Sequence, residues 1–221
     1  MTNCSPRRSP HERNPAMSPR SRDRDKRSSR PFSTRTDLRR RPGGTRAERR
    51  SLLILCEGKT EKQYFVGMRT GAGPQLHVDA PDCDHVAVVR EAKRRGTEEY
   101  DEIWCVLDTE LDERLVTEIL TEAQGTDVHI ALSSPSFELW LILHLKYCSR
   151  PFQTAKEAER VLRELVPGWS KSATRFDDFK EGVEDACDRA RRLHDGEGRP
   201  PNPSSAVWRL VESIRKPASD Q

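Results

Sequence analysis

The sequence predicts an α/β protein in which a parallel sheet is flanked by helices, followed by a helical C-terminal extension and preceded by a basic tail. Two continuous apolar runs, at 51–56 and 103–107, are typical of strands that are covered on both faces. Segments with apolar residues at helical spacing alternate with these runs, and this alternation indicates a parallel sheet. From residue 135 onward the pattern predicts helices alone.

Local signals place the individual elements. After the strand at 51–56, a helix is expected to start at Thr60, because Thr60 as N-cap and Gln63 three residues later would form a capping box. A short strand at 76–79 then precedes a helix that begins near Asp84. The remaining expected elements are strands 103–107 and 128–132 and helices 113–124, 135–147, 154–166, 176–194 and 203–215.

Charge is distributed unevenly along the chain, although the formal net charge of the whole sequence is only +3. Residues 1–50 hold 16 Lys/Arg and 5 Asp/Glu, a balance of +11, whereas the other 171 residues hold 23 and 31, a balance of -8. The basic segment lacks apolar periodicity and is predicted to be disordered. Three roles fit this segment. It is a solubilising tail, a stretch that results from a translation start assigned too far upstream, or a segment that contacts phosphates in a salt-sensitive way. The predicted organisation is a tail at 1–49, an α/β core at 50–133, a helical extension at 134–216 and a short tail at 217–221.

Composition excludes several classes of protein. No apolar segment near Met1 resembles a secretory signal, and no run approaches the ~20 apolar residues that span a bilayer. The six cysteines lie far apart without a C-x-x-C pair, which argues against a zinc site or a disulfide framework. A cytoplasmic protein with reduced cysteines and no membrane association is therefore expected.

Acidic residues directly follow two of the predicted strands. Glu57 comes after the strand at 51–56, and Asp108 and Glu110 come at the end of the strand at 103–107. Because ligands of open parallel sheets bind beyond the carboxyl ends of the strands, these acids are expected to converge on one site. Carboxylates without a nearby His/Cys cluster favour Mg²⁺ or Mn²⁺ over zinc. The alternative is a solvated acidic loop that stabilises the start of the next helix.

The segment 133–144 predicts a buried helix that carries a charge. Ser134 as N-cap, with Pro135 at the first helical position, is a start signal, and the following residues are apolar nearly all round. Glu138 falls in the first turn, where an ionised carboxylate is costly unless a cation, hydrogen bonds or the helix dipole compensates. It is either a metal- or substrate-directed group or a simple first-turn acid. His144 is expected to be a hydrogen-bonded core histidine.

Taken together, these motifs resemble the RloB-like family from about residue 50 to residue 216. The matching features are Cys56-Glu57-Gly58-Lys59-Thr60-Glu61 with Tyr64-Phe65, the segment 100–108, the block 133–144, Lys171 and the segment 202–207. The resemblance implies a Toprim-type fold related to the nuclease domains of OLD-like systems. It also implies a part in prokaryotic antiviral defence by abortive infection, beside an RloA-type ATPase encoded nearby.

The resemblance further implies a set of site residues. The family has a first-strand acid, here Glu57, and an Asp-x-Asp pair that chelates Mg²⁺. Asp108 keeps the first position of that pair, whereas Glu110 replaces the second Asp and moves its carboxylate outward by one methylene. The expected activity is Mg²⁺-dependent hydrolysis of nucleic-acid phosphodiesters, with DNA and RNA both open. Glu57 would act as a metal ligand or as the general base for water, and Glu138 would complete the coordination shell of the metal.

Two lysines and one asparagine complete the expected site. Lys171, or Lys59 beside the first strand, would neutralise charge that develops on the phosphate, and each is equally well explained as an ordinary exposed lysine. Asn202 before Pro203 is interpreted first as a helix cap and second as a substrate-facing residue. The alternative function is a non-catalytic sensor or regulatory subunit that binds a nucleotide or a metal. A third is turnover of mononucleotides.

Overall fold

The computed structural model describes residues 49–96 and 99–217, all within one unit that starts at Arg46. The predicted disordered tail at 1–49 lies, apart from its last residue, outside the described residues. No helix in the described part of the chain has both the length and the apolar character needed to cross a bilayer.

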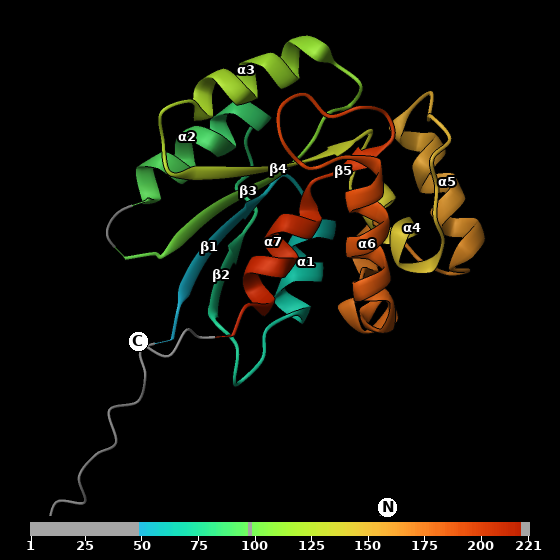
Figure 1. The fold of residues 1–221 in the computed structure, drawn as a ribbon, viewed down its shortest axis with the longest axis horizontal. Helices are drawn as coiled ribbons and strands as arrows, with labels where there is room; N and C mark the ends of the chain where they lie inside the picture. The colour runs from blue at the N-terminus through green and yellow to red at the C-terminus, as the bar shows by residue number, and fades with distance from the viewer. Residues whose placement is uncertain (1–48, 97–98, 218–221) are drawn as a thin grey trace, which may run out of the picture. The chain divides into compact units, whose positions relative to one another are not determined.

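The centre of the fold is a five-stranded sheet with the order β2-β1-β3-β4-β5 (Figure 1). Its parallel strands are β1 (Ser51–Cys56), β2 (Gln75–Asp79), β3 (Glu102–Asp108) and β4 (Val128–Ser134). A short strand, β5 (Ser204–Ser205), pairs antiparallel with β4. The predicted α/β class with a mostly parallel sheet is confirmed. The prediction of helices alone after residue 135 is wrong at β5, because a pair of serines carries no apolar strand pattern.

Helices cover both faces of the sheet. On one face α2 (His85–Arg95) and α3 (Glu113–Ala123) pack against side chains such as Leu53 and Leu55 (Figure 1). The alternate side chains, Leu52 and Ile54, face the other layer, because successive residues of a strand point to opposite faces. That layer consists of α1 (Lys59–Gly67), α4 (Glu138–Leu145), α5 (Ala155–Leu165), α6 (Val183–Leu193) and α7 (Val207–Arg215).

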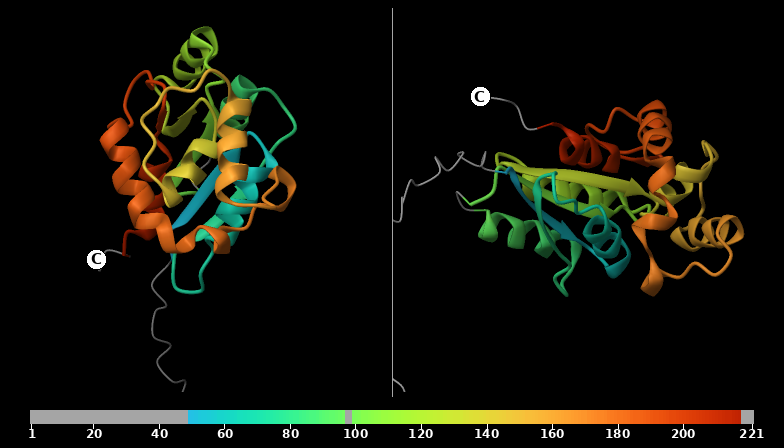
Figure 2. Two further views of the ribbon diagram at one scale, coloured as in Figure 1. Left: turned by 90° about the vertical axis from the view of Figure 1, so that its right-hand side faces the viewer. Right: turned by 90° about the horizontal axis from the view of Figure 1, so that it is seen from below.

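The carboxyl ends of the parallel strands face α4, α5 and α6, and the left panel of Figure 2 looks onto this end of the sheet. Three short 3-10 turns connect α5 to α6, namely η1 (Lys171–Ala173), η2 (Phe176–Asp178) and η3 (Lys180–Gly182). The predicted single helix at 176–194 is therefore two of these turns followed by α6.

The start of α1 differs from the prediction. The helix begins at Lys59 with Gly58 as N-cap, so Thr60 and Gln63 lie inside the helix and form no capping box. Instead, Thr60 Oγ1 donates to the carbonyl oxygen of Lys171 at 3.2 Å. Gln63 bonds twice to the backbone of the same segment. Both side chains thus attach α1 to the segment that carries Lys171, a tertiary contact that local sequence does not reveal.

The two X-Pro pairs expected at helix starts both lie outside the helices. The Ser134–Pro135 and Asn202–Pro203 peptide bonds are cis, and the helices that follow, α4 and α7, begin further along the chain. Asn202 bonds through its side chain to the backbone of Phe152, accepting from the amide at 3.1 Å and donating to the carbonyl at 2.6 Å. The predicted caps are wrong because an X-Pro pair is also a turn signal. The predicted helix start near Asp84, by contrast, is confirmed, and Asp84 is the N-cap of α2.

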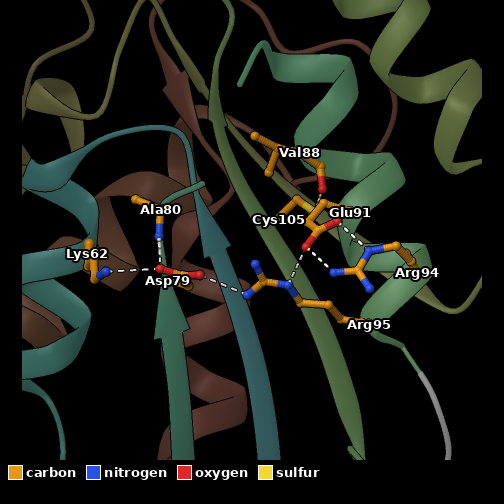
Figure 3. Close-up of polar contacts among 8 residues, drawn as sticks. All are labelled: Lys62, Asp79, Ala80, Val88, Glu91, Arg94, Arg95 and Cys105. Atoms are coloured by element: carbon orange, nitrogen blue, oxygen red, sulfur yellow. Dashed lines mark hydrogen bonds and ion pairs between the residues drawn. The ribbon is translucent and has the colours of Figure 1, made fainter. Parts of the chain in front are cut away.

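A polar network joins the edge strand β2 to the helices on both faces (Figure 3). Asp79 accepts hydrogen bonds from Arg95 of α2 at 2.8 Å and from Lys62 of α1 at 3.0 Å. These two cations hold the pKa of Asp79 at about 2, below its usual range. Arg95 also pairs with Glu91 at 2.6 Å. The edge strand is therefore held by satisfied ion pairs.

Candidate metal centre

Two of the predicted acids meet at the carboxyl ends of β1 and β3. These strands are paired in register, and the amide of Glu57 donates to the carbonyl of Val106 at 3.1 Å. The carboxylate of Glu57 turns toward β3 and accepts a hydrogen bond from the amide of Asp108 at 3.0 Å. Glu57 and Asp108 thus lie side by side, where the strand ends were expected to bring them.

Asp108 carries a buried oxygen that is not satisfied by the protein. Its Oδ1 atom has no hydrogen-bond partner among the described residues. Burial raises the pKa of Asp108 well above its usual value, and the nearby carboxylates of Glu61 and Glu57 raise it further. A buried carboxylate is costly to ionise unless a positive charge compensates it, so this position requires a proton or a cation.

Two more carboxylates reach the site from helices. Glu61, in the first turn of α1, is 6% exposed, and its Oε2 atom has no hydrogen-bond partner in the described segments. Burial, together with Glu57 and Glu138, raises the pKa of Glu61 to about 7. Glu138 of α4 is 2% exposed, accepts a hydrogen bond from Ser136 at 2.6 Å and pairs with Lys171 at 2.9 Å. We call Glu57, Glu61, Asp108 and Glu138 the carboxylate cluster.

A second group of potential ligands adjoins the cluster. Glu57, His85 and Glu110 each place one ligand-type atom within 4.8 Å of the others, and we call them the outer triad. His85 Nε2 lies 2.9 Å from Glu57 Oε2. The adjacent Glu57 carboxylate raises the pKa of His85, although burial acts in the opposite direction. The sequence shows no His/Cys cluster beside the acids, and the structure adds a single histidine, His85, to them.

The loop that carries Glu110 has an unusual backbone. Glu110 and the next residue, Leu111, have φ angles of 48° and 61°, in the left-handed region that residues with side chains rarely adopt. The surrounding structure fixes the loop, because the amide of Glu110 donates to the carbonyl of Pro135 at 3.1 Å. Such strain is concentrated at functional sites, where a side chain must be held in one place. In this loop, the exposed Glu110 side chain places a carboxylate oxygen within 4.8 Å of ligand-type atoms of Glu57 and His85.

The two lysines predicted for the site differ in their surroundings. Lys171 lies 2.9 Å from Glu138 and 3.8 Å from Glu159. Burial acts to lower the pKa of Lys171, but the hydrogen bond and charge of Glu138, with other acids nearby, raise it overall. Lys59 is exposed at the start of α1, and it forms no ion pair within the described part of the chain. The structure therefore brings Lys171, more than Lys59, to the cluster.

Sequence reasoning missed Glu61 and His85. Glu61 lies four residues after Glu57, in the first turn of α1, and a second carboxylate so close to a strand end was a signal that could have been used. His85 is the first residue of α2, soon after the end of β2. Examining every strand end, β2 included, would have brought it into consideration.

His144, expected in the core, is 4% exposed and lies 2.9 Å from the Tyr64 hydroxyl through Nε2.

The donor set fits a divalent cation. Unpartnered buried oxygens of Asp108 and Glu61 face other carboxylates, which is costly unless positive charge is brought in. Carboxylate oxygens are the ligands that Mg²⁺ and Mn²⁺ prefer. The imidazole of His85 adds a nitrogen donor at the edge of the set.

Fold and site together define an α/β protein with acids gathered at the carboxyl edge of a mostly parallel sheet. The sequence profile of the family described as RloB-like protein matches residues 52–214. The chain therefore belongs to the RloB-like family, which confirms the resemblance found in the sequence. No curated protein and no solved structure shows a significant match to it.

Proposed function

We propose that this protein is a metal-dependent nuclease that hydrolyses phosphodiester bonds of nucleic acids. The observation that carries the proposal is the pair of buried, unpartnered carboxylate oxygens on Asp108 and Glu61 beside Glu57. Asp79, at the end of a neighbouring strand, is instead paired with two cations, Lys62 and Arg95. The Toprim-type fold and the relation to OLD-like nuclease domains, both implied by the resemblance, belong to this proposal.

The proposed ligands are Asp108, Glu57 and Glu110. A bound divalent cation would supply Lewis acidity and lower the pKa of a water molecule. Glu57, which accepts a hydrogen bond from the Asp108 amide, is also the candidate base that accepts a proton from that water. Glu57 follows the end of β1, Asp108 ends β3, and Glu110 lies in the loop after β3, so the sheet and this loop set their spacing.

Lys171 and Glu138 have complementary proposed roles. Glu138 is buried and hydrogen-bonded to Ser136, so it holds the ammonium group of Lys171 beside the carboxylate cluster. Lys171 is the proposed counter-charge for the phosphate as negative charge develops on it. Lys59, exposed at the start of α1, is proposed to contact phosphate more peripherally.

Mn²⁺ is proposed to support activity better than Mg²⁺. Mg²⁺ prefers oxygen ligands, whereas an imidazole nitrogen suits later divalent metals. Because His85 is part of the outer triad, the site offers a mixed oxygen and nitrogen set. The sequence alone indicated Mg²⁺, with Mn²⁺ as its substitute, because His85 was not recognised.

The proposal is tested with purified protein and labelled single-stranded and duplex DNA and RNA, in Mn²⁺, Mg²⁺ or EDTA. Cleavage is expected in Mn²⁺, and it should be lost in EDTA and in the Glu57→Gln and Asp108→Asn variants. Glu118→Gln, on the exposed face of α3, is the matched control that should cleave normally. Metal binding without turnover would favour the alternative, a sensor or regulatory subunit. Turnover of mononucleotides but not of polymers would indicate a small-molecule enzyme.

We further propose the cellular role that the family resemblance implies. The protein would act in the cytoplasm as the effector of a prokaryotic antiviral, abortive-infection system, together with an RloA-type ATPase. The same cleavage assay repeated with that ATPase added tests the partnership. A change in rate or substrate choice that needs both proteins would support it, and identical cleavage with and without the ATPase would contradict it.

A further inference from the structure

A groove of about 740 Å³ runs along α1 from the neighbourhood of the carboxylate cluster. We call it the α1 groove, and its lining includes Lys59, Lys62, Val66, Ala173, Arg175 and Phe176. One wall is α1, and the other is the segment between η1 and η2, so the groove extends over much of the 9-residue helix. A helix of that length is about 13 Å long, at 1.5 Å per residue.

One end of the α1 groove adjoins the proposed site. Lys59 is two residues after Glu57 in the sequence, on the first turn of α1. On the opposite wall, Ala173 belongs to the same 3-10 turn as Lys171, whose ammonium group pairs with Glu138. A chain lying in the groove would therefore lead directly to the acids.

The charge of the α1 groove is opposite to that of the rest of the body. Its lining holds three cations, Lys59, Lys62 and Arg175, and one acid, Asp177, a balance of +2. Residues 51–221, by contrast, hold 23 basic and 31 acidic residues, a balance of -8. A local positive surface on an acidic protein attracts a polyanion to that surface in preference to others.

The cations of the groove are available to an external anion. Lys62 pairs with Asp79 and Arg175 with Asp178, but their side chains are 40% and 74% exposed. Exposed pairs of this kind contribute little energy, so a phosphate can replace the carboxylate at small cost. Lys59 makes no ion pair within the described residues.

Apolar side chains lie between these cations. Val66 is 37% exposed and lines the groove together with Ala173 and Phe176. An apolar surface between positive charges suits a single strand, whose unpaired bases present their faces while its phosphates remain accessible. In a duplex the base faces are stacked inside, and this surface would have nothing apolar to contact.

We propose that the α1 groove binds a single strand of nucleic acid that continues from the scissile phosphate at the carboxylate cluster. Phosphates contact Lys59, Lys62 and Arg175, and a base packs on Val66 and Phe176. The inference rests on the proposed nuclease function, and it adds the path of the substrate and its single-stranded state. Recognition of this kind is tolerant of sequence, because it reads the backbone charge and the face of any base.

The test is fluorescence anisotropy with labelled single-stranded DNA and RNA oligonucleotides in EDTA, so that binding is measured without cleavage. The variant combines Lys62→Glu with Arg175→Glu. The matched control combines Arg90→Glu with Lys93→Glu on α2, which covers the other face of the sheet and whose cations also pair with a carboxylate. Both proteins change net charge by the same amount.

The groove variant is expected to bind at least about tenfold more weakly than the wild type, and the control within about twofold. The slope of log affinity against log salt should fall by about 1.4 in the groove variant, because each lost contact to a single-strand phosphate removes about 0.7. Equal binding by the two variants, absence of single-strand binding by the wild type, or equal loss on duplex would overturn the proposal. Thermal melts of both variants check that each is folded.

Hydrolysis of bis(p-nitrophenyl) phosphate in Mn²⁺ separates this inference from the proposed function. That small diester reaches the acids without occupying the α1 groove, so the groove variant should hydrolyse it at the wild-type rate. If neither this diester nor any polymer is hydrolysed while binding still depends on Lys62 and Arg175, the proposed nuclease function is wrong and the proposed strand-binding role of the groove is supported. If the diester is hydrolysed and the two variants bind polymer equally, the proposed role of the groove is wrong and the proposed nuclease function is supported.

Discussion

Asp79 and Asp108 end two strands that flank β1 in the same sheet, yet their surroundings are opposite. Asp79 accepts hydrogen bonds from Arg95 and Lys62, and its pKa is lowered to about 2 (Figure 3). Asp108 has a buried oxygen without a partner in the described residues, faces other carboxylates, and its pKa is raised well above normal. The comparison indicates that Asp79 stabilises the fold, whereas Asp108 needs a positive charge that the described residues do not supply.

The largest expected difference between the two aspartates is in activity. Asp108→Asn should reduce nucleic-acid cleavage at least about 100-fold, which is the upper end of the cost of losing a group that merely supports a metal ligand. Asp79→Asn should cleave normally, because Asp79 takes part in ion pairs at the edge strand and not in the carboxylate cluster. Initial rates in Mn²⁺ decide the matter. Comparable rates for the two variants would contradict the assignment of Asp108.

Metal addition should distinguish the same pair through stability. At 100 times the dissociation constant, a bound cation adds about 2.7 kcal/mol to the free energy of unfolding. For a domain of this size that corresponds to an increase in Tm of about 5 to 10 °C. Scanning calorimetry with and without Mn²⁺ should show this increase for the wild type and for Asp79→Asn, but not for Asp108→Asn. An equal increase in all three proteins would place the ion elsewhere.

The metal-free protein should lose stability as pH rises. The pKa of Glu61 is about 7 in the folded protein, above the ordinary 4.5, so the folded state binds the proton more tightly. The free energy of unfolding should therefore decrease between about pH 4.5 and 7, by an amount on the order of 2 kcal/mol. Urea denaturation in EDTA at pH 5 and pH 8 measures it. Glu61→Gln should flatten this dependence, and Glu118→Gln should not; parallel profiles would show that Glu61 is not responsible.

The smallest expected effect is that of Asp79 on stability, and its sign is opposite. The pKa of Asp79 is lowered from 3.8 to about 2, so its contribution is complete above about pH 4 and disappears as pH falls through 2. Because its side chain is 39% exposed, Asp79→Asn should cost less than about 1 kcal/mol at pH 7. Denaturant titrations of both proteins at pH 7 and at pH 2 test this. A gap that persists at pH 2 would assign the effect to something other than charge.

The comparison also shows how far sequence alone can predict this molecule. Continuous apolar runs located the long strands, and the acids at the ends of β1 and β3 indicated Glu57 and Asp108. The buried helix with one charge indicated Glu138. All three are properties of a few consecutive residues. Asp79 is satisfied because Arg95 and Lys62 reach it from two different helices. Local sequence cannot show that these residues come together there and that no such cation reaches the buried oxygen of Asp108 in the described residues.

The residues that were missed or misassigned have the same explanation. In the sequence, Thr60 fits a helix-capping pattern, but in the folded protein its hydroxyl donates a hydrogen bond to the backbone carbonyl of Lys171. His85 is one histidine among six in the sequence until the sheet places it beside Glu57. Lys59 and Lys171 looked equivalent as exposed lysines, and only tertiary structure pairs Lys171 with Glu138.

The hydrogen bonds from Thr60 and Gln63 to the Lys171 segment have a mechanical consequence. They connect the first turns of α1 to the segment 171–174, even though these segments are far apart in the sequence. The spacing between Glu61 and Lys171 therefore depends on these three hydrogen bonds. Replacing the hydroxyl of Thr60 would loosen a lysine that is encoded more than a hundred residues away.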